Sequence, residues 1–212
     1  DHGDDDHEDK DHGDDDHGDK DHEDDDHANH DDHAHGAWDP HFWFDPLRVK
    51  IAISEITLQL TALDPLGART YRDNSISYIS ELDELHAWAQ TTLNTVPEAR
   101  RVLITSHHTM GYFALRYNYE IVGTIIPNIN EGTEVTAKDL TELIDTVIKL
   151  GVPAIFVEST TSDRMANQIA REVGVLAVNS TYTDSLGKPG EGADTYITMM
   201  RSNITTITEA LR

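Results

Sequence analysis

The chain of 212 residues contains no cysteine, which excludes a disulfide framework and any thiolate metal site. Basic residues are scarce: 16 Lys+Arg stand against 40 Asp+Glu, which gives a formal net charge of −24. An acidic surface of this kind repels nucleic acid and anionic lipid, so we expect neither as a partner. Long apolar runs are lacking too, and no stretch approaches the roughly 20 apolar residues of a transmembrane helix.

Signatures of several enzyme classes are also missing. The sequence contains no HExxH, no GxSxG elbow and no glycine-rich phosphate loop. It shows no signal peptide, but it does not open on Met and it begins inside a low-complexity run. We therefore expect the natural polypeptide to start further upstream, with a secretion signal in that region.

The acidity is concentrated at the N-terminus. Residues 1–35 contain eighteen Asp+Glu and two Lys, a net charge of −16, whereas the remaining residues together carry only −8. Residues 36–212 therefore have the composition of an ordinary, mildly acidic globular protein. Their number allows one large domain or two small ones.

Residues 1–30 are three copies of a ten-residue repeat with a histidine at every fifth position. Charge repulsion and the lack of apolar residues predict that residues 1–36 are disordered. Imidazoles between carboxylates suit zinc, which favours a loose metal-collecting loop over a solvated acidic linker or an artificial tag. The histidines expected to form these weak sites are His2, His7, His12, His17, His22, His27, His30, His33 and His35.

The stretch DPHFWFDP, residues 39–46, holds His41 between two prolines. Proline fixes its own φ and biases the preceding residue toward an extended conformation, so this stretch is predicted to be a stiff, non-helical corner. The aromatic residues that follow His41 should bury the corner against a core. A histidine presented from a rigid turn suits metal ligation, although a buried turn histidine that bonds only to backbone would leave the same pattern.

Apolar periodicity predicts two helices after this corner, over residues 48–63 and 70–93. The first is expected to be amphipathic, and Asp-Pro-Leu-Gly at residues 64–67 should end it. The apolar positions of this first helix are Ile51, Ile53, Ile56, Leu58, Leu60 and Leu63. On the second helix we interpret His86 and Trp88 as packing residues.

From residue 100 onward short apolar strands alternate with helices. The predicted strands are residues 101–105, 120–126, 154–157 and 175–178, and the predicted helices are 109–117, 136–150, 163–173 and 193–211. Regular alternation of this kind predicts an α/β fold with a parallel sheet covered by helices on both faces. This part of the chain is long enough to bury a sizeable core.

Polar residues follow three of the predicted strands, where ligands bind in open α/β sheets. His107 and His108 follow the first strand, Glu158 follows the third, and Asp184 comes after the fourth. Two histidines and one or two carboxylates, with His41 added, make a nitrogen and oxygen site suited to zinc or manganese.

An enzymatic interpretation of the same residues uses Glu158 as the general base of a metallohydrolase. Ser106 and Ser185 lie near His or Asp residues and are candidate nucleophiles. A serine at a strand end is more often the cap of the following helix, so the enzyme remains the weaker alternative.

Four motifs together carry a resemblance to a known family. They are DPHFWFDP, then TSHHTMGYFALRY, then IFVEST, then YTDSLGKPGEGADTYITMMRSN, in this order after the His/Asp-rich run. From about residue 39 to the end, the chain closely resembles the metal-binding solute-binding proteins of ABC importers, in the zinc branch of the zinc/manganese (cluster A-I) family. Members of this family have two α/β lobes joined by one long rigid helix, with the metal held between the lobes.

By this resemblance, residues 37–68 are a remnant of the N-terminal lobe, 69–97 the linking helix and 98–212 the C-terminal α/β lobe. The family's N-terminal lobe normally precedes the His-rich loop and donates a first histidine. Most of that lobe is therefore expected to be missing from this sequence, together with the fourth ligand.

The motif match implies that His41, His107 and Asp184 are the ligands of Zn²⁺, with Mn²⁺ as the alternative ion. Glu158 matches a glutamate that lines the cleft and should contact a ligand rather than the ion. His108 occupies a position where the family motif is not fixed, so it is left out of the site. The glycines and proline at residues 187–190 are interpreted as loop formers.

The resemblance implies a periplasmic protein, monomeric and without catalytic activity, that captures zinc and delivers it to the membrane permease of an ABC importer. The zinc-dependent hydrolase stays as the alternative. A third possibility is an acidic metal buffer that works without a transporter.

Overall fold

The computed structural model describes residues 39–126, 135–158 and 164–212, which lie within one unit that spans His33–Arg212. The predictions made for residues 1–36, including the nine loop histidines, fall outside the described residues. No helix in the described part of the chain is long and apolar enough to cross a membrane.

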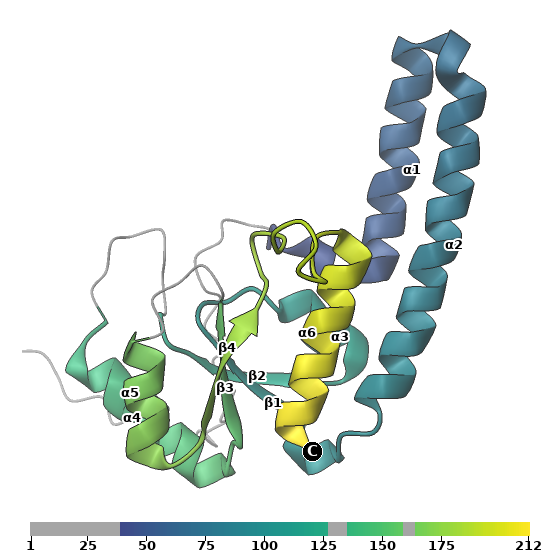
Figure 1. Cartoon of the computed structure of the whole chain (residues 1–212). Helices are drawn as coiled ribbons and strands as arrows, with labels where there is room; N and C mark the ends of the chain where they lie inside the picture. The colour runs from purple at the N-terminus through teal and green to yellow at the C-terminus, as the bar shows by residue number, and fades with distance from the viewer. Residues whose placement is uncertain (1–38, 127–134, 159–163) are drawn as a thin grey trace, which may run out of the picture. The chain divides into compact units, whose positions relative to one another are not determined.

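The first elements form a helical hairpin, in which α1 (Pro46–Leu63) and α2 (Ala68–Leu93) pack along each other (Figure 1). Both predicted helices are confirmed. α1 begins where Pro46 follows Asp45, whose side chain accepts a hydrogen bond from the backbone N–H of Leu47 at 3.0 Å. It ends at Asp64, and the short 3₁₀ helix η2 (Pro65–Gly67) turns the chain into α2.

The amphipathic interpretation of α1 is wrong. Of its six predicted apolar positions only Ile53 is partly buried against the core, and the other five are exposed. Leu63 is 83% exposed and Leu66, in the turn, is fully exposed. The periodicity predicted the helix correctly. Within the described part of the chain, however, α2 alone does not cover all of the apolar positions of α1.

The rest of the described chain alternates strands and helices as predicted. In order these are η3 (Glu98–Arg100), β1 (Val102–Thr105), α3 (Gly111–Tyr117), β2 (Glu120–Thr124), α4 (Ala137–Leu150), β3 (Ala154–Glu158), α5 (Arg164–Val173), β4 (Leu176–Thr181) and α6 (Tyr196–Leu211). β4 runs three residues beyond its predicted end, which brings the strand closer to Asp184.

The strands form two parallel pairs rather than one continuous ladder. β1 pairs with β2, with Val102 opposite Glu120, and β3 pairs with β4, with Ala154 opposite Leu176. The two pairs meet at β1 and β3, which lie next to each other (Figure 1). The predicted α/β fold with parallel strands is confirmed, and the carboxyl ends of β1 and β3 lie together.

Helices cover both faces of these strands. Successive residues of a strand point to opposite faces, so they pack in two different cores. Leu103 and Phe156 pack in one core with α2, α3 and α6, whereas their neighbours Ile104 and Ile155 pack in a second core with α4 and α5. The second half of α2 supplies Leu82, Leu85, Ala89 and Leu93 to the first core.

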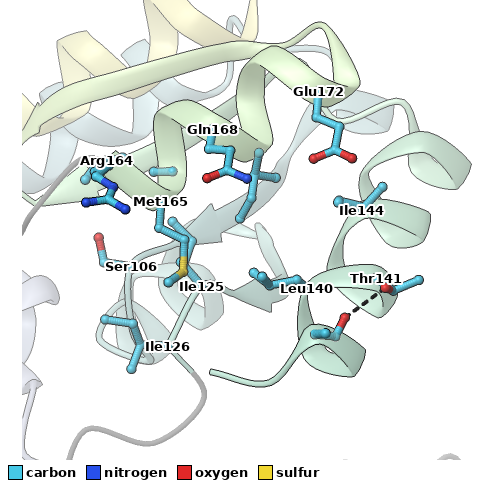
Figure 2. A pocket seen from close by; sticks show the side chains of 14 residues that line it. Ser106, Ile125, Ile126, Leu140, Thr141, Ile144, Arg164, Met165, Gln168 and Glu172 are labelled. Carbon is cyan, nitrogen blue, oxygen red and sulfur yellow. Dashed lines mark hydrogen bonds between the residues drawn. The ribbon is translucent and has the colours of Figure 1, made fainter. Parts of the chain in front are cut away.

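A cavity of about 580 Å³ lies on the α4 and α5 side of the strands (Figure 2). Its walls are mainly apolar, as at Leu140, Ile144 and Met165, with Gln168 and Glu172 of α5 at the wall as well. Ile126 and Arg164 at its edge adjoin the ranges 127–134 and 159–163, which lie outside the described residues. We assign no ligand to it.

Candidate metal centre

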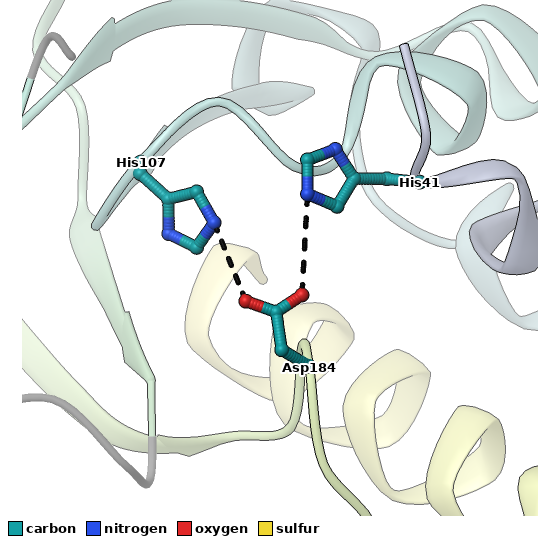
Figure 3. Close-up of side chains that lie close together, drawn as sticks. All are labelled: His41, His107 and Asp184. Atoms are coloured by element: carbon teal, nitrogen blue, oxygen red, sulfur yellow. Dashed lines mark ion pairs between the residues drawn. The ribbon is translucent and has the colours of Figure 1, made fainter. Parts of the chain in front are cut away.

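Three of the predicted site residues come together, from three different segments. His41 precedes the 3₁₀ helix η1 (Phe42–Phe44), His107 lies just after β1, and Asp184 lies just after β4. One ligand atom from each lies within 4.8 Å of the others. The Asp184 carboxylate faces both imidazoles, with Oδ2 at 3.5 Å from His107 Nε2 and Oδ1 at 3.9 Å from His41 Nε2 (Figure 3).

These separations fit one ion of the size of Zn²⁺. Two ligand atoms bound at about 2.1 Å in a tetrahedron lie about 3.4 Å apart, which is close to the distance between His107 Nε2 and the Asp184 carboxylate. A second pair, from His41 Nε2 to that carboxylate, is 3.9 Å apart, and all three ligand atoms lie within 4.8 Å of one another, so binding one ion requires the side chains to move closer. Three such ligands would leave one tetrahedral position open.

Glu158 lies behind His107, on the side of the ring away from Asp184. Its Oε1 is paired with His107 Nδ1, and both side chains are buried. A carboxylate only accepts, so this contact places the ring proton on Nδ1 and leaves Nε2 directed at Asp184. The predicted place of Glu158, against a ligand and not among the ligands, agrees with this geometry.

Ser106 does not cap the helix that follows it. Its buried Oγ accepts a hydrogen bond of 3.1 Å from the backbone N–H of Glu158, so it joins the ends of β1 and β3. Thr105 Oγ1 donates to the backbone carbonyl of His107 at 2.8 Å. Both bonds fix the backbone on which His107 and Glu158 are mounted.

The corner that carries His41 is less extended than predicted. Phe42–Phe44 form one turn of 3₁₀ helix, with bonds from the N–H of Phe44 to the carbonyl of His41 at 3.4 Å and from the N–H of Asp45 to the carbonyl of Phe42 at 3.1 Å. Phe44 is buried in the core and Trp43 is partly buried, but Phe42 is exposed. The prediction of a non-helical corner is therefore wrong. The expected burial of the corner by aromatic side chains comes from Phe44 and Trp43 and not from Phe42. His41 itself is buried.

The residues just before Asp184 are held by bonds to the corner and to α6. Trp43 Nε1 donates to the carbonyl of Thr183 at 3.0 Å, and Tyr196 Oη donates to the carbonyl of Trp43 at 2.8 Å. Asn203 of α6 bonds to both the N–H and the carbonyl of Tyr182, at 2.9 Å and 2.6 Å. The corner, the loop and α6 are thereby tied together, and no sequence signal pointed to this clamp.

Two other histidines, His108 and His86, are not part of the cluster of His41, His107 and Asp184. His108 contributes no atom to the group of ligand atoms. His86 lies on α2 with its ring against Tyr117 and Nδ1 at 3.3 Å from the Tyr117 hydroxyl, which agrees with a packing role. Burial raises the pKa of Tyr117 far above its usual value, so this hydroxyl stays protonated.

The fold and this cluster define a class of protein: an α/β protein with a candidate metal site, in which two side chains at the carboxyl ends of parallel strands meet a histidine from the corner before α1. The family profile described as zinc-uptake complex component A, periplasmic (ZnuA) matches residues 3–210. The chain belongs to this family.

Relatives of known name agree with this assignment. The manganese-binding lipoprotein MntA of Halalkalibacterium halodurans is 34% identical over 173 residues, which cover 82% of this chain and 57% of that protein. The zinc-binding protein TroA of Treponema pallidum is 30% identical over 179 residues, 82% of this chain and 58% of TroA. The chain thus spans a little more than half the length of these relatives.

Solved structures show the same fold. The periplasmic zinc-binding protein TroA of Treponema pallidum superposes with a TM-score of 0.75 at 30% identity, over 82% of this chain and 64% of TroA. A manganese-bound periplasmic metal-binding protein of Candidatus Liberibacter asiaticus gives a TM-score of 0.71 at 29% identity, over the same shares of the two chains. The names of these relatives describe metal-binding proteins and no enzyme.

Proposed function

We propose that this chain is the metal-holding part of a substrate-binding protein that captures zinc in the periplasm and delivers it to the permease of an ABC importer. The observation that supports it best is the convergence of His41, His107 and Asp184 on one point. The relatives named above bind zinc or manganese by name, and the chain shares their fold.

The ligand chemistry favours zinc as the transported ion. Two imidazoles with one carboxylate are softer than the oxygen-rich sites that manganese prefers, and affinity at a given nitrogen and oxygen site rises from manganese to zinc. Both imidazoles are buried, whereas the side chain of Asp184 is 48% exposed, so the ion enters and leaves on the Asp184 side.

In competition titrations, zinc is expected to displace bound manganese from the protein because the site has two nitrogen donors. The measurement is the release of manganese, followed by its electron paramagnetic resonance signal, as zinc is added. Retention of manganese against an equal concentration of zinc would contradict the preference for zinc and place the chain in the manganese branch of the family.

The hydrolase alternative conflicts with the position of Glu158. A general base must reach water on the ion, and the ion would lie on the Nε2 side of His107. Glu158 is buried against Nδ1, the opposite side of the same ring. Its carboxylate therefore holds the imidazole and does not face the reaction space that a hydrolase would need.

The histidines of residues 1–35 are proposed to collect zinc beside the main site, through an increase in local concentration. Each imidazole must be neutral to bind, so this binding should weaken as the pH falls through about 6.5. Deletion of residues 1–35 is expected to remove the weak sites and leave the tight site nearly unchanged in calorimetry. Loss of the tight site on deletion would show that one of these histidines is itself a ligand.

A further inference from the structure

We propose that Asp39 is a positioning residue of the metal centre: it fixes the tautomer and the direction of the His41 ring, as Glu158 does for His107. The inference rests on the proposed function, because it deepens the account of the same site. Neither the motif match nor the comparisons assign a role to Asp39.

The contact between Asp39 and His41 is short, and in it the Asp39 carboxylate is the acceptor. Asp39 Oδ1 lies 2.7 Å from His41 Nδ1 and also accepts the backbone N–H of His41 at 2.9 Å. A carboxylate can only accept, so Nδ1 carries the ring proton and Nε2 keeps its lone pair. Nε2 is the nitrogen that faces Asp184. The ring is therefore held in the tautomer that can bind an ion at this point.

The start of α3 holds the backbone of Asp39 and lies against its carboxylate. Tyr112 Oη donates to the backbone carbonyl of Asp39 at 3.2 Å. Gly111 lies under the other carboxylate oxygen: a Cβ built on Gly111 would be 3.1 Å from Asp39 Oδ2. A side chain at residue 111 would press on Oδ2, so the carboxylate would have to shift by a few tenths of an ångström.

Each of the two imidazoles thus has a carboxylate at its Nδ1, and the two carboxylates come from different parts of the chain. Asp39 and His41 are two residues apart in one turn, whereas Glu158 reaches His107 from a neighbouring strand. In each pair a carboxylate holds Nδ1 and the opposite nitrogen faces Asp184. Carboxylate partners of this kind orient a ligating histidine and raise its basicity, and their loss usually costs about 10- to 100-fold in metal affinity.

The chain offers a matched control for the turn itself. Asp64 stands in the same Asp-Pro-X sequence, and its Oδ1 accepts the N–H of Leu66 at 3.2 Å, as Asp39 does for His41. Residue 66 is a leucine, so no imidazole stands two positions after Asp64, and Asp64 Oδ2 also accepts from Tyr71 Oη at 2.8 Å. Asp64→Ala therefore removes the same backbone bond without touching the site.

The test uses the full chain with four substitutions: Asp39→Ala, Asp39→Asn, Gly111→Ala and Asp64→Ala. Zinc affinity is measured by competition with a chromophoric chelator. The tautomer of His41 is read in the metal-free protein from long-range ¹⁵N–¹H spectra, with the His41 signal assigned by its loss in His41→Gln. Asp39→Ala should bind zinc about 10- to 100-fold more weakly and show a mixture of His41 tautomers.

The other variants sharpen the result. Asp39→Asn keeps an acceptor oxygen and should retain the Nδ1–H tautomer with a smaller loss of affinity than Asp39→Ala. Gly111→Ala should lower affinity by displacing Asp39, and Asp64→Ala should leave affinity and tautomer unchanged. The proposal is overturned if Asp39→Ala binds zinc like Asp64→Ala, or if it loses affinity while His41 keeps the Nδ1–H tautomer.

Failure of the proposed function would look different. An unsubstituted chain that binds no zinc, yet shows His41 as the Nδ1–H tautomer that Asp39→Ala abolishes, would refute zinc capture and leave the positioning role standing. Tight zinc binding with no dependence on Asp39 would refute only the positioning role.

Discussion

Replacement of His107 by alanine is expected to weaken zinc binding by about 100- to 1,000-fold. Tight zinc sites are worth about 10–16 kcal/mol, which is about 2.5–4 kcal/mol for each of four ligands. The change also deprives the buried Glu158 carboxylate of its partner at Nδ1, which adds to the cost of holding the site together. Affinity is measured by chelator competition at pH 7.

His108→Ala is the matched control, because it removes the adjacent imidazole from the same loop. His108 contributes no atom to the ligand group, so its loss should change affinity by no more than about twofold. Equal losses in the two variants would contradict the assignment, and a larger loss in His108→Ala would exchange the roles of the two histidines.

Asp45→Ala is expected to lower the free energy of unfolding by about 3 kcal/mol. Asp45 is 2% exposed and does two things at once. Its Oδ1 caps α1, and its Oδ2 accepts two hydrogen bonds from Arg116 of α3, at 3.0 Å and 2.7 Å. These bonds raise the pKa of the Arg116 guanidinium above its usual value. Because the Arg116 side chain is 36% exposed, we place the loss at the lower end of the range for buried pairs.

The measurement is urea denaturation, with the midpoint and the slope determined together. Asp83→Ala is the control: Asp83 also joins two elements, through an ion pair of 2.5 Å with Lys50, but it is exposed. Exposed pairs contribute about 0.2–1 kcal/mol, so this variant should unfold almost like the unsubstituted protein. Equal destabilisation by the two substitutions would mean that Asp45 does not lock α1 onto α3.

Local sequence rules predicted most of the elements because their start and stop signals are strong. α4, for example, begins at Thr136, which forms a reciprocal cap with Asp139, and ends at Gly151 with a φ of 61°. The same rules predicted that His107 and Asp184 share one edge, since the carboxyl ends of parallel strands do so. His41 was found through its place in the corner.

What the sequence could not predict depends on contacts between distant segments. The bond from Trp43 to Thr183 joins residues 140 positions apart, and the bond from Glu158 to Ser106 joins residues 52 apart. The exposure of Ile51 and Leu63 could not be predicted for the same reason. The periodicity of a helix identifies its apolar positions but not the segments of the chain that would cover them. The role proposed for Asp39 is a different case: an Asp two residues before a ligating His is a local signal, and it could have been used.

The central claim is that His41, His107 and Asp184 bind one ion. Crystals of the zinc-loaded protein, measured at the zinc absorption edge, test it most directly through the anomalous signal. The account predicts a zinc peak at about 2.0–2.2 Å from Nε2 of both imidazoles and from the Asp184 carboxylate, with Asp39 and Glu158 still on the two Nδ1 atoms. A zinc peak bound through Nδ1 of either histidine, or one away from these three side chains, would contradict it.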